Sequence, residues 1–201
     1  MNSIKAVFLD RDGTIIEDKH YIMDPEQVSL MPNSAEGLFL LQSVGYRLIV
    51  VTNQSGIARG YFTVKDMELV NKKMCELLKD KGVTINKIYY CPHYDKDIPN
   101  GLYKKECTCR KPKPGMAYMA RDELHIDLDQ TYMIGDKISD IEFGKNAGCR
   151  GTILLANRRM DSSNHFASHI SVDLLAAANW IINEEEGNEN DKNISGYTFK
   201  Q

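Results

Sequence analysis

Short apolar segments alternate with helical patterns along most of this chain, and this alternation is the strongest constraint on its fold. The apolar runs have the length of buried parallel strands and span 5–9, 46–51, 85–90, 132–134 and 152–155. The helical patterns occupy 35–44, 64–81, 114–124, 139–146 and 172–182. Strands that alternate with helices predict an α/β fold, a Rossmann-like parallel sheet with helices on both faces. The intervals between elements leave room only for small inserts, so we expect no large cap.

Size and composition predict one globular domain. The chain has 201 residues, of which 42% are hydrophobic and 26% charged, values typical of globular proteins. We expect residues 1–183 to form the domain, with a long irregular loop at 91–109. The segment 184–201 is acidic and poor in aliphatic residues, so we expect a mobile acidic tail there.

Charge and hydropathy limit the partners and the compartment. The formal net charge is −3, which argues against binding to nucleic acid, because such binding usually needs a basic face. The apolar stretch Ala6–Leu9 is too short for a secretion signal, and no apolar run approaches a membrane-spanning length. We therefore expect a cytoplasmic monomer without a membrane partner. The five cysteines are an odd number and do not indicate a disulfide framework.

Two carboxylates follow the first predicted strand, in the segment DRDGT. Asp10 and Asp12 are one residue apart at a strand terminus, so their side chains emerge in different directions. One can attack a substrate while the other transfers protons. Gly13 allows a sharp turn directly afterwards. Ordinary turns and calcium loops use the same residue types, so this segment alone leaves both interpretations open.

Further polar segments are predicted at the same edge of the sheet. The segment TNQSG at 52–56 can bind an anion, GDK at 135–137 adds a carboxylate, and RKPK at 110–113 adds positive charge. Each segment by itself is more typical of a polar turn. Ligands of parallel sheets bind beyond the carboxyl ends of the strands, and carboxylates gathered there need a cation, for which Mg²⁺ is the natural choice. Together the segments indicate phosphoryl transfer.

In their order along the chain, the segments DRDGT, TNQSG, RKP and GDK resemble the four motifs of the haloacid dehalogenase superfamily of aspartate-nucleophile phosphatases. The longer segments NQSGIARGYFT, YYCPH and CTCRKPKPGM resemble one branch of it, the phosphatases that remove the 7-phosphate of D-glycero-D-manno-heptose 1,7-bisphosphate. The similarity covers residues 4–156. It implies a Mg²⁺-dependent phosphatase of carbohydrate metabolism that acts in nucleotide-activated heptose biosynthesis through an aspartyl-phosphate intermediate.

The resemblance also implies roles for single residues. Asp10 would be the nucleophile, and Asp12 would protonate the leaving oxygen and later deprotonate water. Thr52 and Lys111 would stabilise the transferring phosphoryl group. Asp10, the main-chain oxygen of Asp12 and Asp136 would hold Mg²⁺.

Further positions match substrate contacts of the same branch. They are Asp18, Lys19, His20, Tyr21, Asn53, Gln54, Ser55, Arg110 and Lys137. Members of the branch often carry glycine where this chain has His20, so the larger side chain would narrow or reshape the sugar pocket. Considered without the family, His20 is more typical of an exposed loop residue.

The loop at 91–109 contains a Cys-x-His pair and a Cys-x-Cys pair. The candidate ligands are Cys91, His93, Cys107 and Cys109. Three thiolates and one imidazole make a closed tetrahedral zinc set, with no open position for water, so this zinc would be structural. It would hold the loop ends and thereby place Arg110 and Lys111. Two chance pairs in a cysteine-bearing loop are the alternative. Cys75 and Cys149 are predicted to be small buried residues.

Two alternative functions use the same residues. A histidinol-phosphatase is similar in its acid pair and zinc loop, but the continuation GIARGYFT and the lack of a second catalytic domain favour the heptose branch. A non-catalytic interaction module, built on an inactive phosphatase scaffold around the zinc loop, is more remote. It requires a missing catalytic group, yet the proposed nucleophile, acid, phosphate-binding and metal-binding residues are all present.

Overall fold

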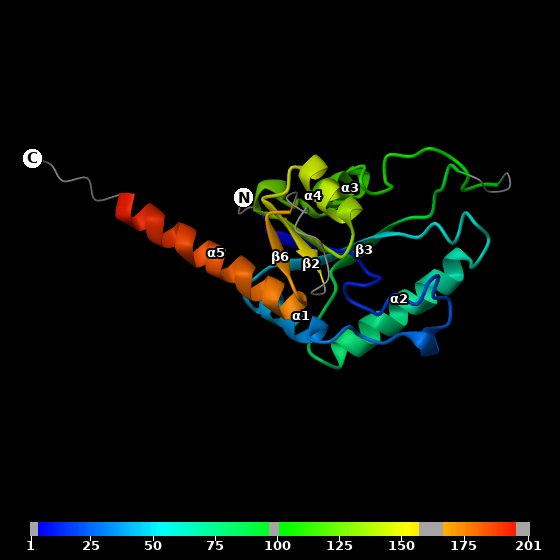
Figure 1. Cartoon of the computed structure of the whole chain (residues 1–201), viewed down its shortest axis with the longest axis horizontal. Helices are drawn as coiled ribbons and strands as arrows, with labels where there is room; N and C mark the ends of the chain where they lie inside the picture. Colours follow the sequence, from blue (N-terminus) through cyan, green and yellow to red (C-terminus); the bar gives the residue numbers. More distant parts are fainter. Residues whose placement is uncertain (1–3, 97–100, 157–166, 196–201) are drawn as a thin grey trace, which may run out of the picture.

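A six-stranded parallel sheet forms the centre of the protein, in the order β3-β2-β1-β4-β5-β6 (Figure 1). This computed structural model describes residues 4–96, 101–156 and 167–195. The strands are β1 (Ala6–Leu9), β2 (Arg47–Asn53), β3 (Lys87–Cys91), β4 (Tyr132–Gly135), β5 (Gly151–Leu155) and β6 (His169–Ser171). The predicted parallel α/β fold is confirmed.

Helices cover both faces of the sheet. They are α1 (Ser34–Ser43), α2 (Val64–Lys79), α3 (Gly115–Leu124), α4 (Ile138–Ala147) and α5 (Leu174–Ser195). Buried residues of α1, α2 and α5 share one hydrophobic cluster with the sheet, while those of α3 and α4 share a second cluster on the opposite face. The described segments that join β1 to α1 and β2 to α2 contain only loops and the short 3-10 helix Pro25–Gln27, as expected for small inserts.

Side chains of the central strand alternate between the two cores. Val7 and Leu9 of β1 belong to the cluster under α1, α2 and α5, whereas Ala6 and Phe8 belong to the cluster under α3 and α4. All four residues are fully buried. A strand buried on both sides must be apolar throughout, which is why β1 has no polar residue before Asp10.

Two elements differ from the sequence-based expectations. β6 was not predicted, because its three residues, His169–Ser171, contain only one apolar side chain. The last helix was expected to end at Ile182 but continues to Ser195, so the boundary expected at 183 falls inside α5. Residues 196–201 lie outside the described residues, and mobility of the acidic segment stays a prediction.

One contact ties the acidic part of α5 to the body of the protein. The hydroxyl of Tyr46 donates to Oε1 of Glu185 at 2.5 Å, and Nζ of Lys5 lies 2.8 Å from Oε2. Tyr46 is only 2% exposed, so Glu185 supplies the acceptor for a buried hydroxyl. Glu185 therefore ties α5 to the body of the protein where the helix passes the start of β2.

We expect Glu185→Ala to lower the free energy of unfolding by about 1–2 kcal/mol, because it leaves the Tyr46 hydroxyl without this acceptor. Urea unfolding followed by the fluorescence of the single tryptophan, Trp180, measures the change. Glu186→Ala is the matched control, since the Glu186 side chain is exposed. Equal stability of the two variants would show that the contact does not anchor the helix.

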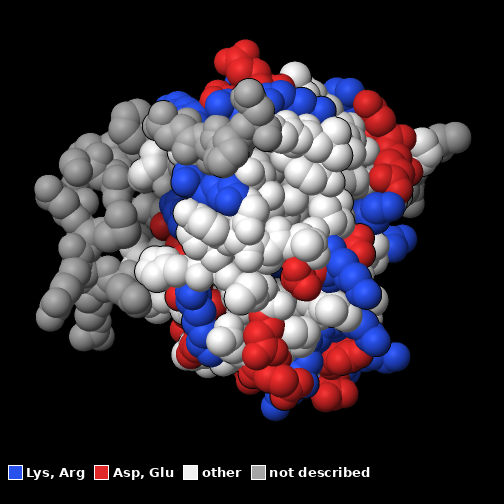
Figure 2. Space-filling view, turned by 90° about the vertical axis from the view of Figure 1, so that its right-hand side faces the viewer, with Lys and Arg blue, Asp and Glu red and all other residues white. Residues whose placement is uncertain are grey.

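Charges of both signs are mixed on one face of the molecule. On the face shown in Figure 2, Lys and Arg side chains are interspersed with Asp and Glu around an uncharged central area. Nucleic-acid-binding proteins usually present a continuous basic surface, and this face has none. Within the described residues, no helix is both long and apolar enough to cross a membrane.

Candidate active site

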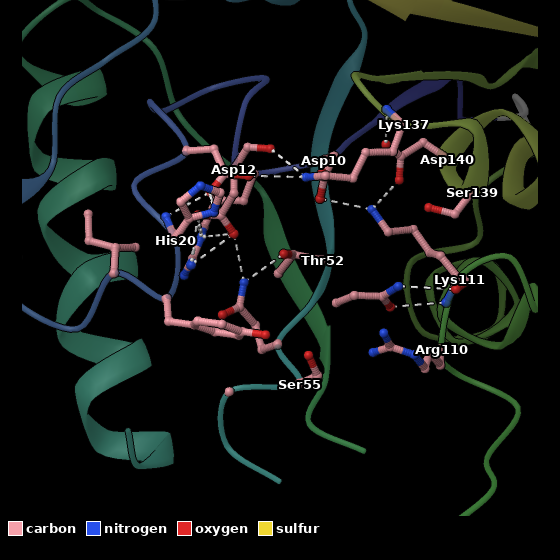
Figure 3. A pocket seen from close by; sticks show the side chains of 17 residues that line it. Asp10, Asp12, His20, Thr52, Ser55, Arg110, Lys111, Lys137, Ser139 and Asp140 are labelled. Carbon is pink, nitrogen blue, oxygen red and sulfur yellow. Dashed lines mark hydrogen bonds and ion pairs between the residues drawn. The ribbon is translucent and has the colours of Figure 1, made fainter. Parts of the chain in front are cut away.

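The carboxyl ends of the central strands meet at a cavity of about 310 Å³ (Figure 3). Asp10 directly follows β1, and Thr52 lies at the end of β2. Parallel pairing of Leu9 with both Val50 and Ile134 sets these strand ends side by side. Lys111 reaches the same cavity from the loop between β3 and α3. The predicted catalytic residues are therefore brought together from distant parts of the sequence.

Asp10 and Lys111 form a buried ion pair inside this cavity. Nζ of Lys111 donates to Oδ1 of Asp10 at 2.8 Å and lies 2.7 Å from Oδ1 of Asp140. Burial raises the pKa of Asp10, but the charges of Lys111 and Lys137 outweigh burial and hold this pKa below its ordinary value. Burial likewise lowers the pKa of Lys111, and the two carboxylates more than reverse that effect. Asp10 is thus ionised near neutral pH, as a carboxylate nucleophile must be.

Asp12 presents its carboxylate to the same cavity. Nη2 of Arg11 lies 3.0 Å from each Asp12 oxygen, and Nε of Arg11 lies 3.2 Å from each. Nε2 of Gln54 donates to Oδ2 of Asp12 at 2.9 Å and to Oγ1 of Thr52 at 2.8 Å. These bonds join Asp12 to Thr52 across the cavity, as the dashed lines in Figure 3 show.

Asn53 fixes the main chain of Lys111. The Lys111 N–H donates to Oδ1 of Asn53 at 3.0 Å, and Nδ2 of Asn53 donates to the Lys111 carbonyl at 3.1 Å. Asn53 was predicted as a substrate contact. It lines the cavity, but both polar atoms of its amide already bond to the main chain of Lys111, so in this structure it supports a residue that is predicted to be catalytic.

A cluster of carboxylates beside Asp10 could hold a metal ion. Oxygen atoms of Asp10, Asp136 and Asp140 lie within 4.8 Å of one another. Gly13 has a φ of +83°, and a Cβ at that position would collide with the Asp136 carboxylate. Oδ1 of Asp136 is buried and accepts no hydrogen bond from the described residues. Hard oxygen ligands with an unsatisfied buried atom fit Mg²⁺.

The ammonium group of Lys137 faces the oxygens that were predicted to bind Mg²⁺. Its Nζ lies 3.4 Å from Oδ1 of Asp136 and 3.8 Å from Oδ2 of Asp10. It also lies 3.4 Å from the main-chain oxygen of Asp12. The oxygen atoms of three predicted metal ligands thus converge on one positively charged group. Oxygens gathered in this way create a negative potential that attracts a cation. Asp12 turns its main-chain oxygen, not its carboxylate, toward this point.

We expect Mg²⁺ affinity to fall below about pH 6 by up to about tenfold per pH unit. Burial raises the pKa of Asp136 to about 6, and although Lys137 opposes this shift, Asp10 and Asp140 add to it. Below this pH the metal-free protein holds a proton on Asp136, which Mg²⁺ must displace, so binding weakens as pH falls. Calorimetric titration with Mg²⁺ between about pH 5 and pH 7 measures this.

Asp136→Asn is the control for that titration. Its Mg²⁺ affinity should be lower at every pH and should lose most of the pH dependence, because the titrating group is gone. If Mg²⁺ affinity had the same pH dependence in Asp136→Asn and in the unmodified protein, Asp136 would not be the group whose proton competes with Mg²⁺.

All but one of the predicted substrate contacts line the 310 Å³ cavity. The exception is Lys19, whose Nζ donates to the main-chain oxygen of Gln27 at 2.7 Å and to Oγ of Ser29 at 2.9 Å. Lys19 also pairs with Glu17 at 3.3 Å. These contacts direct its ammonium group to Gln27, Ser29 and Glu17 rather than into the cavity, and the substrate contact of Lys19 stays a prediction.

His20 and Tyr21 form a backbone turn at the cavity mouth that favours glycine. Their φ angles are +52° and +61°, in the left-handed region. Asp18 supports the turn by accepting the His20 N–H at 3.0 Å. The His20 side chain is 94% exposed at the rim. The ring of Tyr21 packs edge-on against Tyr61, with centroids 4.7 Å apart.

The predicted zinc ligands converge in the loop that follows β3. Sγ of Cys91 lies 3.5 Å from Sγ of Cys107 and 3.8 Å from Nδ1 of His93. Nδ1 of His93 lies 3.4 Å from Sγ of Cys109. Tetrahedral zinc with bonds of about 2.0–2.3 Å keeps its ligand atoms roughly 3.4–3.8 Å apart, so this cluster could hold zinc. Hydrogen bonds from Cys91, His93 and Cys107 lower the pKa of Cys109 to about 5, which supplies a thiolate ligand.

The cluster of candidate zinc ligands, referred to below as the zinc cluster, is connected directly to the residues that line the cavity. Arg110 follows Cys109, lines the cavity and donates from Nη1 to the main-chain oxygen of His93 at 3.4 Å. Lys111 is the next residue. The loop therefore positions two cationic side chains of the site, as the sequence predicts.

Sequence reasoning missed the contributions of Arg11 and Asp140. Both are buried, with 1% and 0% exposure, and both touch a predicted catalytic group. Asp140 occupies the first turn of α4, where Oδ2 accepts the Lys137 N–H at 3.0 Å while Oδ1 faces Lys111. Its position four residues after Asp136 at a helix start was the available signal. For Arg11, the only signal in the sequence was its position between Asp10 and Asp12.

Comparisons with known proteins identify the class to which this fold and site belong. Residues 108–177 match the model of the HAD-hydrolase-like family. A crystal structure of D,D-heptose 1,7-bisphosphate phosphatase from B. bronchiseptica, complexed with magnesium and phosphate, superposes with a TM-score of 0.75 and 28% identity, covering 90% of this chain and 99% of that one. The protein is a HAD-like hydrolase.

Curated relatives specify the family more narrowly. D-glycero-beta-D-manno-heptose-1,7-bisphosphate 7-phosphatase from Pasteurella multocida (strain Pm70) is 45% identical over 151 residues, covering 75% of this chain and 81% of the relative. The enzyme of the same name from Escherichia coli (strain K12) is 38% identical over 184 residues, covering 90% of each chain. The chain belongs to the D-glycero-beta-D-manno-heptose-1,7-bisphosphate 7-phosphatase family.

Proposed function

We propose that this protein hydrolyses the 7-phosphate of D-glycero-D-manno-heptose 1,7-bisphosphate, as a step in nucleotide-activated heptose biosynthesis. The observation that carries the proposal is the buried Asp10–Lys111 pair in a cavity next to an oxygen-lined cation site. A carboxylate nucleophile, a fixed positive charge and a metal site are what phosphoryl transfer to aspartate requires. The names of the relatives supply the substrate.

In the first step, an Oδ atom of Asp10 attacks phosphorus while the bond from phosphorus to the sugar oxygen breaks. Asp12 donates its proton to that leaving oxygen, so the sugar departs as an alcohol. In the second step, water attacks the aspartyl phosphate. Asp12 takes a proton from the water, the bond from Asp10 to phosphorus breaks, and inorganic phosphate is released. Both residues return to their starting protonation states.

Charge on the phosphoryl oxygens is balanced by the groups around Asp10. Lys111 and the hydroxyl of Thr52 supply donors from two sides of the cavity. Mg²⁺ held by Asp10, the main-chain oxygen of Asp12 and Asp136 would supply additional positive charge to these oxygens. Such preorganised electrostatic contacts are usually the largest contribution to catalysis.

The cavity rim would select the sugar and its second phosphate. Arg110 and Lys137 provide positive charge, and Ser55 and Gln54 provide hydrogen-bonding groups. Asp18 and the exposed ring of His20 lie at the mouth. A cavity of about 310 Å³ fits a small phosphorylated sugar.

The proposal also includes structural zinc at the cysteine loop, a monomeric state and a cytoplasmic location. The ligand set has no open position, so zinc would act by holding the loop that carries Arg110 and Lys111. The mixed surface charge suits a protein whose partner is a small molecule rather than nucleic acid or a membrane.

A steady-state panel with Mg²⁺ tests the proposed substrate. Phosphate release is measured from heptose 1,7-bisphosphate, fructose 1,6-bisphosphate and histidinol phosphate, and phosphorus NMR identifies which phosphate remains. We expect the highest kcat/KM for the heptose bisphosphate, with heptose 1-phosphate as product. A preference for histidinol phosphate would replace this assignment, and no release from any substrate by folded, zinc-loaded protein would favour the interaction module.

A further inference from the structure

Arg11 is a fully buried charged residue for which the mechanism above has no role. Its side chain is 1% exposed, and it is among the largest buried side chains of the described structure. A buried ion pair often contributes little to stability compared with apolar residues of the same size, because both charges lose their hydration. Stability alone therefore does not explain an arginine at this position.

All three nitrogen atoms of the Arg11 guanidinium group have partners. Nε and Nη2 contact both oxygens of Asp12 at 3.0–3.2 Å. Nη1 donates to Oδ1 of Asn71, on α2, at 2.8 Å. Nδ2 of Asn71 in turn lies 2.9 Å from Sδ of Met67, one helical turn earlier. A continuous set of contacts thus runs from a rigid helix through Arg11 to the carboxylate of Asp12.

The two ends of this set differ in exposure. The Asp12 side chain is 18% exposed and lines the cavity, whereas the Arg11 side chain behind it is buried. Asp12 is followed by Gly13, which has no side chain to restrict the loop. The direction of the Asp12 carboxyl group is therefore set by the Arg11 contacts on the buried side, together with the hydrogen bond from Gln54 in the cavity.

We propose that Arg11, held by Asn71, is a positioning residue that keeps Asp12 at the point where protons are transferred. The inference rests on the proposed function, in which Asp12 serves two steps. It must reach the leaving oxygen of the sugar and then, after the sugar has left, the attacking water. A planar guanidinium that holds both oxygens keeps one geometry through both steps, and a lysine, which carries a point charge, does not.

The choice of leaving group separates this role from a merely structural one. A sugar alcohol needs a proton as it leaves, whereas the p-nitrophenolate ion leaves p-nitrophenyl phosphate without one. We expect Arg11→Lys to lower kcat for heptose 1,7-bisphosphate by about 10–100-fold, since small displacements of a catalytic group have effects of this size. With p-nitrophenyl phosphate, the burst of p-nitrophenolate in the first turnover reports only the attack of Asp10, so its rate should stay within about threefold, and KM for the sugar should not change.

A second variant and a matched control make the test independent of one substitution. Asn71→Ala removes the acceptor of Nη1 and should shift the ratio of the two activities in the same direction by a smaller factor. Arg121→Lys makes the same chemical change in a surface pair with Asp122 on α3 and should leave both activities unchanged. Thermal unfolding and zinc content establish that each variant is folded.

Four outcomes would overturn the proposal. Equal losses in kcat for the sugar and in the burst rate with p-nitrophenyl phosphate would assign Arg11 a structural role, and no change in either would assign it none. A shift in the ratio for Arg121→Lys would show that the ratio is not specific to Asp12. If the unmodified protein prefers another alkyl phosphate, the proposed substrate is wrong. The Arg11 proposal is then tested with that preferred ester in place of the heptose bisphosphate. If it cleaves no alkyl phosphate, both proposals fail.

Discussion

Replacement of Asp10 by asparagine is expected to lower turnover by at least about 10⁴-fold while the fold and the zinc content stay unchanged. The amide is nearly the same size as the carboxylate but cannot attack phosphorus. Lys111 keeps its contact with Asp140 at 2.7 Å, so the buried ammonium group retains a partner. Phosphate release, zinc analysis and thermal unfolding of the same preparation measure the three expectations.

Asp122→Asn is the matched control for this substitution. Asp122 is exposed on α3, and among the contacts described for it, it pairs only with Arg121. The activity of the Asp122→Asn variant should therefore equal that of the unmodified protein. Substantial residual turnover in Asp10→Asn would exclude Asp10 as the nucleophile. Loss of zinc in that variant would contradict the separation of the catalytic and zinc sites.

Cys107→Ser is expected to remove zinc, lower thermal stability and reduce kcat/KM by about 10–100-fold or more. Zinc binding in four-ligand sites contributes about 10–16 kcal/mol in small zinc domains, so loss of one thiolate has a large effect. Catalysis falls because Arg110 and Lys111 follow Cys109 directly and lose the support of the loop. Metal analysis, thermal unfolding and steady-state kinetics report the three effects.

Cys75→Ser separates this effect from cysteine substitution in general. Cys75 lies half-buried on α2, away from the zinc cluster, so the variant should retain zinc and activity. If Cys107→Ser lost zinc but kept full activity, zinc would have no part in placing Arg110 and Lys111.

The order and type of most elements could be predicted because local sequence determines them. Buried parallel strands are continuous apolar runs, and helix ends carry their own signals. Thr63 and Asp66, for example, form a capping box at the start of α2. β6 has no such local signal, because it is held by pairing with β5 and by stacking of His169 on Trp180 of α5. The contacts of Glu185 with Tyr46 and Lys5, just beyond the expected end of the last helix, join residues that are far apart in sequence and have no local signal either.

The candidate site was predictable to the extent that it depends on strand ends. A parallel sheet places Asp10, Thr52 and Asp136 at one edge whatever the details of the loops. The directions of loop side chains are set by three-dimensional contacts instead. Lys19 turns to Ser29 and Gln27, and Asn53 is engaged by Lys111. Neither contact leaves a pattern in the sequence.

The parallel pairing of β1 with β2 and β4 has a consequence for the kinetics of folding. The proposed catalytic groups at positions 10, 52 and 111, and Asp140 beside them, come together only after these strands have paired across long intervals of chain. Closing long loops costs conformational entropy, so such contacts generally form late, after local helices. A partly folded chain can contain native helices and still lack a nucleophile beside its lysine. Enzymatic activity in this protein therefore reports completed folding, whereas helix content alone does not.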